Sequence, residues 1–266
     1  MAVITDIRGH VALLLLDEPA SRHALSRDLV SGLQQAMDSD AVKRARAVVI
    51  GSTGPFFCAG ANINDLLNGW MQATEPKTDP VRFFERLAND PRPTIAAVGG
   101  GALGGGFELM LSCDLAVANA EAWFCLPELG HGVIPNTALM RLQQMVGLRR
   151  MMGFVMSGQR ISSQQALELG LINALTQDPV ATAIELANSI VTRVAPGALA
   201  VAKSYAHQHA ANNWQAVHQS LLEVPEAEWR EGLTAFTQKR AAQYDEQWQA
   251  QANEHLGRAA PKPETD

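Results

Sequence analysis

The chain has 266 residues, of which 47% are hydrophobic and 18% are charged, a balance typical of a folded protein with a large core. Its formal net charge of −6 gives no general attraction to nucleic acid or to an anionic membrane, so an anionic ligand must be held by local cations. The three cysteines form no CxxC motif and no disulfide framework, which favours a reducing compartment.

The amino-terminal segment 1–19 is interpreted as a strand and not as a signal peptide, because it has neither a basic leader nor a small-residue cleavage site. No apolar run reaches the roughly 18–20 residues that a membrane-spanning helix needs. We therefore expect a soluble, cytoplasmic protein with no membrane partner and no nucleic-acid partner.

Apolar runs alternate with helical patterns through the first half of the chain. Strands are predicted at 10–17, 45–52, 94–100 and 114–120, and helices at 27–38 and 82–89. This alternation predicts an α/β architecture with parallel strand pairing.

From Pro135 onward the strand pattern almost stops, and helical segments separated by Gly, Pro or Ser predict a helical layer. Residues 68–80 contain two prolines and no sustained period, so they are predicted to form a long loop of the kind that often binds ligands. The Pro-rich, charged tail 257–266 is predicted to fray.

The segment 99–108, with the sequence GGGALGGGFE, places six glycines in eight residues between a predicted strand and a predicted helix. Each interior glycine costs roughly 0.5–1 kcal/mol relative to alanine, so the run requires a reason. A dinucleotide-binding GxGxxG is a weak interpretation, because Asp114 precedes the next strand and Glu121 lies beyond it. Close packing and an oxyanion hole, in which bare backbone N–H groups bind a carbonyl oxygen, are the alternatives.

A second loop, residues 54–62, also follows a predicted strand and carries small residues around Gly60. Two such loops facing one pocket favour the oxyanion hole over packing alone. Glu108 and Glu128 follow in apolar surroundings, where an acid is seldom a simple surface residue.

Six segments, in this order, resemble the enoyl-CoA hydratase/isomerase, or crotonase, superfamily. They are 18–26, 56–66, 93–118, 122–135, 157–173 and 231–240. The resemblance implies an α/β fold, a crotonase-like spiral of ββα units over residues 1–200 that contains the acyl-CoA site. It also implies a helical carboxy-terminal trimerisation region over residues 201–266, and a homotrimer or a dimer of trimers.

The resemblance further implies that the backbone N–H groups of Ala61 and Gly105 form the oxyanion hole. Glu108 would chiefly activate water for attack at the β-carbon of a 2-enoyl-CoA, and Glu128 would chiefly protonate the α-carbon. Two carboxyl groups that share one water cannot both ionise comfortably, so one pKa is expected to rise. The expected activity is that of an enoyl-CoA hydratase without metal or other cofactor, coenzyme A being part of the substrate.

Other residues match positions expected to contact the acyl-CoA. Arg22 and Lys239 match contacts to the nucleotide end, although a purely solvated role is the alternative for each, and Phe236 either lines the same groove or packs in its helix. The remaining expected contacts are Ala24, Ala59, Gly60, Asn62, Ile63, Gly104, Pro127 and Asn136. His23, where the family more often has asparagine, is expected to hydrogen-bond backbone.

Three features depart from the pattern. Residues 134–139 lack the glycines that usually follow the second acid, so the acyl end of the pocket is expected to be reshaped. Asn62 replaces a common aspartate, and His131 adds a titratable group three residues after Glu128.

Several alternatives therefore stay open. A double-bond isomerase would need only one carboxylate, and a thioester hydrolase or a decarboxylase could use the same oxyanion hole. A catalytically silent acyl-CoA-binding protein would be expected to lose one or both acids.

Overall fold

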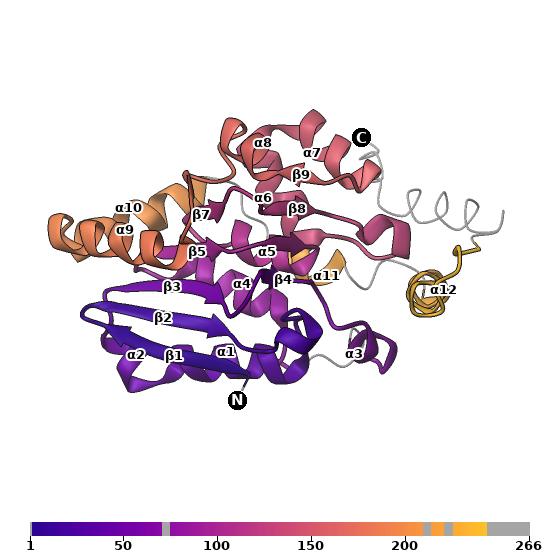
Figure 1. The fold of residues 1–266 in the computed structure, drawn as a ribbon, viewed down its shortest axis with the longest axis horizontal. Coiled ribbons are helices and arrows are strands. Elements are labelled where there is room, and N and C mark those ends of the chain that lie inside the picture. Colours follow the sequence, from indigo (N-terminus) through magenta and orange to yellow (C-terminus); the bar gives the residue numbers. More distant parts are fainter. Residues whose placement is uncertain (1, 71–74, 210–213, 221–225, 244–266) are drawn as a thin grey trace, which may run out of the picture.

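The computed structural model describes residues 2–70, 75–209, 214–220 and 226–243, which fold into two sheets with helices around them (Figure 1). The larger sheet has the order β1-β2-β3-β5-β7-β10 and the smaller one β4-β6-β8-β9. The strands of the larger sheet are β1 Val3–Arg8, β2 Val11–Leu16, β3 Ala47–Ser52, β5 Thr94–Val98, β7 Leu115–Asn119 and β10 Ala174–Thr176. Those of the smaller sheet are β4 Phe56–Cys58, β6 Gly101–Leu103, β8 Trp123–Cys125 and β9 Ile161–Ser162.

Two short 3₁₀ helices, η1 and η2, accompany the α-helices. The helices are η1 Pro19–Ser21, α1 Arg27–Asp38, α2 Asp40–Arg44, α3 Ile63–Leu67, α4 Pro80–Asn89, α5 Gly105–Leu111, η2 Glu128–His131, α6 Asn136–Val146, α7 Leu148–Ser157, α8 Ser163–Glu168, α9 Pro179–Arg193, α10 Pro196–His209, α11 Trp214–Ser220 and α12 Glu226–Thr237.

Consecutive strands alternate between the sheets: β3, β5 and β7 enter the larger sheet, and β4, β6 and β8, which follow them, enter the smaller one. Each strand pair is followed by helix, so the repeating unit is ββα, as the resemblance implied. Within each sheet these strands pair in parallel, which confirms the predicted α/β architecture. The carboxyl ends of β4, β6 and β8 consequently meet at one edge.

The central strands of the larger sheet, β2, β3 and β5, are buried on both faces. Leu14, Val48 and Ala96 face the main core, whereas Leu13 and Val49 pack with α9 on the opposite face. A sheet covered on both sides requires apolar residues at successive positions, which explains the uninterrupted run of leucines in β2.

Several local expectations were wrong in detail. The amino-terminal segment forms two antiparallel strands, β1 and β2, that meet at a turn in which Gly9 has a φ of +63°. Short strands β9 and β10 interrupt the helical second half.

Two expectations concern segment boundaries. The division at residue 200 falls inside α10, and it stays a prediction. Of the predicted loop 68–80, residues 71–74 lie outside the described residues, as does the whole of the tail predicted to fray.

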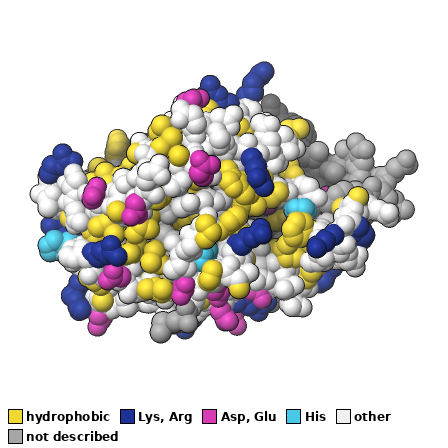
Figure 2. All heavy atoms as spheres, in the orientation of Figure 1, with side chains coloured by type: hydrophobic (Ala, Val, Ile, Leu, Met, Phe, Trp, Pro, Cys, Tyr) yellow, Lys and Arg dark blue, Asp and Glu magenta, His cyan; other side chains and the backbone are white. Residues whose placement is uncertain are grey.

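The surface charges and the lengths of the helices concern two expectations, that of no nucleic-acid partner and that of no membrane partner. On the face shown in Figure 2, acidic and basic side chains are interspersed. None of the helices in the described residues is long and apolar enough to cross a bilayer.

Candidate active site

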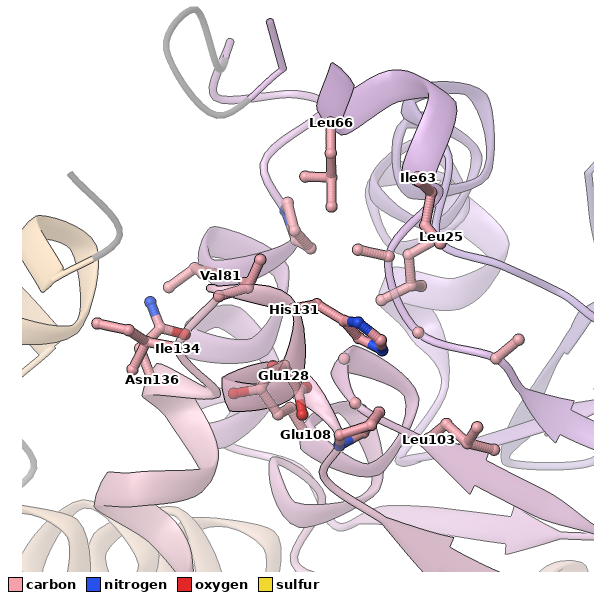
Figure 3. A pocket seen from close by; sticks show the side chains of 18 of the residues that line it. Leu25, Ile63, Leu66, Val81, Leu103, Glu108, Glu128, His131, Ile134 and Asn136 are labelled. Atoms are coloured by element: carbon pink, nitrogen blue, oxygen red, sulfur yellow. The ribbon is translucent and has the colours of Figure 1, made fainter. Parts of the chain in front are cut away.

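A cavity of about 490 Å³ lies where β4, β6 and β8 end (Figure 3). The chain leaves β4 into Ala59, Gly60 and Ala61, leaves β6 into Gly104 and Gly105, and leaves β8 toward Pro127 and Glu128; all of these residues line the cavity. The parallel sheet thus brings together the two glycine loops and both acids, which are far apart in the sequence.

The backbone N–H groups of Ala61 and Gly105 border this cavity and have no acceptor among the described residues. Leu25 donates to the Gly60 carbonyl at 2.7 Å and accepts from Asn62 N–H at 2.9 Å, a bridge that leaves the Ala61 N–H free to point elsewhere. Gly105 is the first residue of α5, where the N–H has no partner within the helix. Within the described part of the chain neither N–H donates a hydrogen bond to protein.

The two N–H groups are close enough to serve one oxygen atom. A Cβ atom placed on Gly105 would lie 3.6 Å from the Ala61 nitrogen and 3.8 Å from the Gly60 Cα. Any side chain at Gly105 would therefore project toward the other donor. This arrangement is what an oxyanion hole requires.

Positions 104 and 60 require glycine for two reasons, the backbone conformation and the lack of room for a Cβ atom. Gly104 has a φ of +50°, and a Cβ there would lie 2.6 Å from Oε1 of Glu128. Gly60 has a φ of +87°, and its Cβ would lie 2.8 Å from the Leu103 carbonyl oxygen. Both conformations disfavour any residue with a side chain.

Three further glycines of the run serve packing. A Cβ on Gly100 would collide with the Pro55 carbonyl, and one on Gly106 would collide with that of Cys58. A Cβ on Gly101 would lie 2.7 Å from the Phe56 ring. The close-packing interpretation therefore holds for these three glycines, and the run has two purposes.

Glu108, on α5, is 6% exposed and accepts a hydrogen bond from Ala138 N–H at 2.9 Å through its Oε1 atom. Burial raises the pKa of this carboxyl to about 7, against the opposing effect of the backbone N–H groups of Ala138 and Thr137. Glu108 therefore keeps its proton to a higher pH than an exposed glutamate does.

Glu128 begins η2 and lies beside Glu108 in the cavity (Figure 3). Its Oε2 atom is buried and has no hydrogen-bond partner in the described residues. Burial, and then the charge of Glu108, raise the pKa of Glu128 well above its ordinary value. Glu108, whose Oε1 atom accepts the Ala138 N–H, is the better placed of the two to be ionised, and Glu128, whose Oε2 atom has no partner in the described residues, is the better placed to hold a proton.

The remaining predicted contacts divide into two groups. The cavity is also lined by Ile63, Asn136 and Phe236. Arg22, Ala24, Asn62 and Lys239 are not part of this lining, and their contact with a ligand stays a prediction.

Asn62 has a structural role that the sequence did not reveal: its side chain caps α3 by accepting from the N–H groups of Asn64 and Asp65. The expected role of His23 is confirmed. Its Nδ1 atom accepts from Glu18 N–H at 3.0 Å, and its Nε2 atom lies 2.7 Å from the Thr53 carbonyl oxygen.

Two aromatic contacts of the cavity wall were not predicted from the sequence. The Arg160 guanidinium lies 3.7 Å from the centre of a Trp123 ring, and both residues line the cavity. The His131 ring packs edge-on against Phe236 at a centroid distance of 4.9 Å. Neither pairing has a local sequence signal, because its partners come from separate segments.

Three polar or aromatic lining residues, Trp70, Asp79 and His218, were also missed. A partial signal existed only for Asp79, since Asp followed by Pro is a common start of a helix, and Asp79 indeed caps α4.

Comparisons with known proteins agree with this geometry. The family model described as enoyl-CoA hydratase/isomerase matches residues 6–247. A 2,3-dehydroadipyl-CoA hydratase from Escherichia coli is 34% identical over 251 residues, covering 91% of this chain and 98% of the relative.

Solved structures give the same result. A carnitinyl-CoA hydratase from Mycobacterium avium superposes with a TM-score of 0.80 at 30% identity, covering 92% of this chain and 98% of that one. An enoyl-CoA hydratase/isomerase from Pseudoalteromonas atlantica superposes with a TM-score of 0.81 at 25% identity, covering 92% of this chain and all of the other.

The ββα spiral and the site at the edge of its smaller sheet define a protein of the crotonase fold. The chain belongs to the enoyl-CoA hydratase/isomerase family.

Proposed function

We propose that this protein is a 2-enoyl-CoA hydratase. The observation that carries the proposal is the juxtaposition of two carboxyl groups with raised pKa values, Glu108 and Glu128, in a cavity bordered by two N–H groups that have no acceptor in the described part of the chain. An isomerase needs one proton-shuttling carboxyl group, whereas water addition uses two groups, one ionised and one protonated.

The thioester carbonyl oxygen would accept hydrogen bonds from the N–H groups of Ala61 and Gly105. Glu108, as carboxylate, takes a proton from water while the water oxygen bonds to the β-carbon. The electron pair of the double bond moves to the α-carbon and the carbonyl oxygen, where the two N–H groups stabilise the negative charge. Glu128 then gives its proton to the α-carbon, which completes the addition of one water molecule.

A direct test supplies purified protein with a short 2-enoyl-CoA in water labelled with ¹⁸O. The expected result is loss of the conjugated absorbance and a 3-hydroxyacyl-CoA that carries the label. A protein that converts a 3-enoyl-CoA into the 2-enoyl isomer, but forms no hydroxyacyl product, would be an isomerase instead.

We further propose a homotrimer or a dimer of trimers assembled through the carboxy-terminal helices, located in the cytoplasm.

Arg22 and Lys239 would contact the nucleotide end of coenzyme A, because phosphates need cations on an acidic protein. The two carboxyl groups and the two N–H groups can supply the proton transfers and the charge stabilisation of the proposed reaction, so we propose that activity survives treatment with a metal chelator. Light scattering at micromolar concentration tests the assembly, and a monomer would contradict it.

A further inference from the structure

The cavity continues past the two carboxyl groups to an end whose walls come from three helices. In Figure 3, Leu103 lies on one side of Glu108. Val81 of α4 and Asn136 of α6 lie on the other side, and His218 of α11 lines the same cavity. Because Glu108 acts at the β-carbon in the proposed reaction, the rest of an acyl chain would extend from there toward these helices.

Helix α11 connects the other two walls of this end. It packs on both α4 and α6, and each of the three helices contributes residues to the cavity lining. Two of its side chains, Trp214 and Val217, are buried in the main core. The position of α11 therefore sets how far the cavity reaches beyond Glu108.

The Asn136 amide joins α6 to α11. Asn136 is 5% exposed, and its Nδ2 atom donates a hydrogen bond to the Val217 carbonyl oxygen at 2.8 Å. Its Oδ1 atom accepts from the Thr137 N–H at 2.9 Å, so both ends of the amide are engaged and its orientation is fixed. A glycine at position 136 would have no amide with which to make the bond to α11.

A second hydrogen bond holds α11 from outside the cavity. The Nε2 atom of His218 lies 2.9 Å from Oε2 of Glu85 on α4, and since a carboxylate only accepts, the ring nitrogen is the donor. This assignment holds for the neutral and for the protonated ring. Glu85 is not part of the cavity lining. Helix α11 is thus tied to α6 through Asn136 and to α4 through Glu85.

We propose that Asn136 determines the acyl-chain length that this protein accepts. Its bond to Val217 holds α11 across the acyl end and restricts the protein to short 2-enoyl-CoA substrates. A longer chain has to push α11 away from α4 and α6, and breaking the buried hydrogen bond opposes that movement. Asn136 is a positioning residue in this role, since it acts through α11. The inference rests on the proposed function and deepens it by naming the substrate class.

The first test measures kcat/KM for 2-enoyl-CoA thioesters with four to about ten acyl carbons. The wild-type value is expected to fall by at least about tenfold from the four-carbon to the ten-carbon substrate, because even one methylene group that a pocket does not admit has an effect of this size. Equal values along the series, or a rise toward the longer substrates, would overturn the proposal.

Asn136→Leu separates the hydrogen bond from the size of the side chain. Leucine is larger than asparagine and cannot donate, so loss of the bond should lower the ratio of four-carbon to ten-carbon kcat/KM by about fivefold. A purely steric role predicts an unchanged or larger ratio, and either result would overturn the proposal. The ratio is compared because the same turn holds Glu108, so the absolute rate also changes. Asn188→Leu, at an exposed position on α9, is the matched control and should leave the ratio unchanged.

Glu85→Ala tests the role of α11 without a change in the cavity lining. It removes the second hydrogen bond to α11, so the same ratio should fall by about threefold or more. Glu185→Ala, at an exposed position on α9, is its control. A Glu85→Ala protein with the wild-type ratio would contradict the role of α11, whether or not the Asn136 variant folds.

Calorimetric binding of saturated acyl-CoA thioesters of the same lengths separates this inference from the proposed reaction. Four-carbon ligands should bind about tenfold tighter than ten-carbon ligands, and Asn136→Leu should reduce that difference. If this holds but no enoyl thioester is hydrated, the hydratase assignment fails and the assignment of Asn136 stands. Hydration without any chain-length preference, in turnover or in binding, would overturn the assignment of Asn136 and leave the hydratase assignment standing.

Discussion

The backbone N–H of Ala138 donates a hydrogen bond to Oε1 of Glu108 across 2.9 Å. This bond links the amino terminus of α6 to an acid on α5 and favours the ionised form of that acid. Burial acts in the opposite direction and is the larger effect, so the pKa of Glu108 is raised to about 7. The segment after Pro135, which lacks the usual glycines, therefore still supplies an N–H that positions Glu108.

Because its pKa is raised in the folded protein, Glu108 is predicted to lower the free energy of unfolding at high pH. The folded protein binds the Glu108 proton more tightly than the unfolded chain does, so the contribution of Glu108 is most favourable below about pH 4.5 and is lost as the pH rises through about 7. Glu108→Gln should therefore raise the free energy of unfolding by up to about 3 kcal/mol at pH 8, with a difference that shrinks toward pH 5.

Urea unfolding of wild type and variant at one protein concentration measures this difference. Glu121→Gln, at an exposed position, is the matched control and should show no comparable pH dependence. A Glu108→Gln variant that is less stable than wild type at pH 8 would contradict the burial argument.

The acid pair should behave as one unit in catalysis. Glu108→Gln and Glu128→Gln are each expected to lower kcat for hydration by roughly 10²-fold or more. The second substitution should lower kcat much less than the first. Once one acid is gone, water attack at the β-carbon and protonation of the α-carbon no longer occur together, so the surviving acid contributes little. Single-turnover rates of both variants and the double variant test this. Additive losses, or a mild effect of Glu108→Gln alone, would favour the isomerase.

The proposed oxyanion hole can be tested by a matched pair of substitutions at Gly105. Proline is tolerated at the first residue of a helix but has no N–H to donate, so Gly105→Pro should lower kcat by about 10²–10³-fold in a folded protein. Gly105→Ala adds a Cβ 3.6 Å from the Ala61 nitrogen and 3.1 Å from Leu25 Cδ1, as proline does, but it retains the N–H, so it should lose less activity than Gly105→Pro. Equal losses in the two variants would show that shape, not hydrogen bonding, matters at this position.

Gly104 should be intolerant of alanine for two independent reasons. The φ of +50° is strained for alanine at a cost of about 1–3 kcal/mol. The alanine Cβ would also lie only 2.6 Å from Oε1 of Glu128, so the Glu128 carboxyl group would have to move. Gly104→Ala should therefore lose both stability and roughly 10²-fold of activity, since small misplacements of a catalytic group are costly.

Gly153→Ala is the control for that substitution. Gly153 lies inside α7 with no atom within 4 Å of a built Cβ, so alanine there should leave activity intact and leave stability unchanged or slightly higher. An active, stable Gly104→Ala protein would refute the placement of Glu128 against the glycine turn.

The two predicted cations should affect the nucleotide end of the substrate selectively. Arg22→Ala and Lys239→Ala are expected to raise KM for full coenzyme A thioesters while changing kcat/KM for truncated pantetheine thioesters little, because exposed cations act on the phosphates. Steady-state kinetics with both substrate types measures this. Equal losses on the two substrates would assign these residues to folding or chemistry.

The sequence by itself determined the buried parallel strands, many of the helices and the four groups at the centre of the site. Continuous apolar runs require a sheet covered on both faces, as β2 and β3 show. The two glycine loops and the two acids each carry a local signal. Glu108 follows its glycine run directly, so its place beside the turn needs no knowledge of distant segments.

Only the tertiary structure decided how these pieces face one another. Strands β4, β6 and β8 have three residues each, too few for periodicity to reveal, yet they form the sheet whose edge holds the site. The same holds for the pairing of Asp79 with His218, since those side chains meet only because α11 packs on α4. Such contacts depend on the summed packing of distant segments, and no local pattern of residues encodes them.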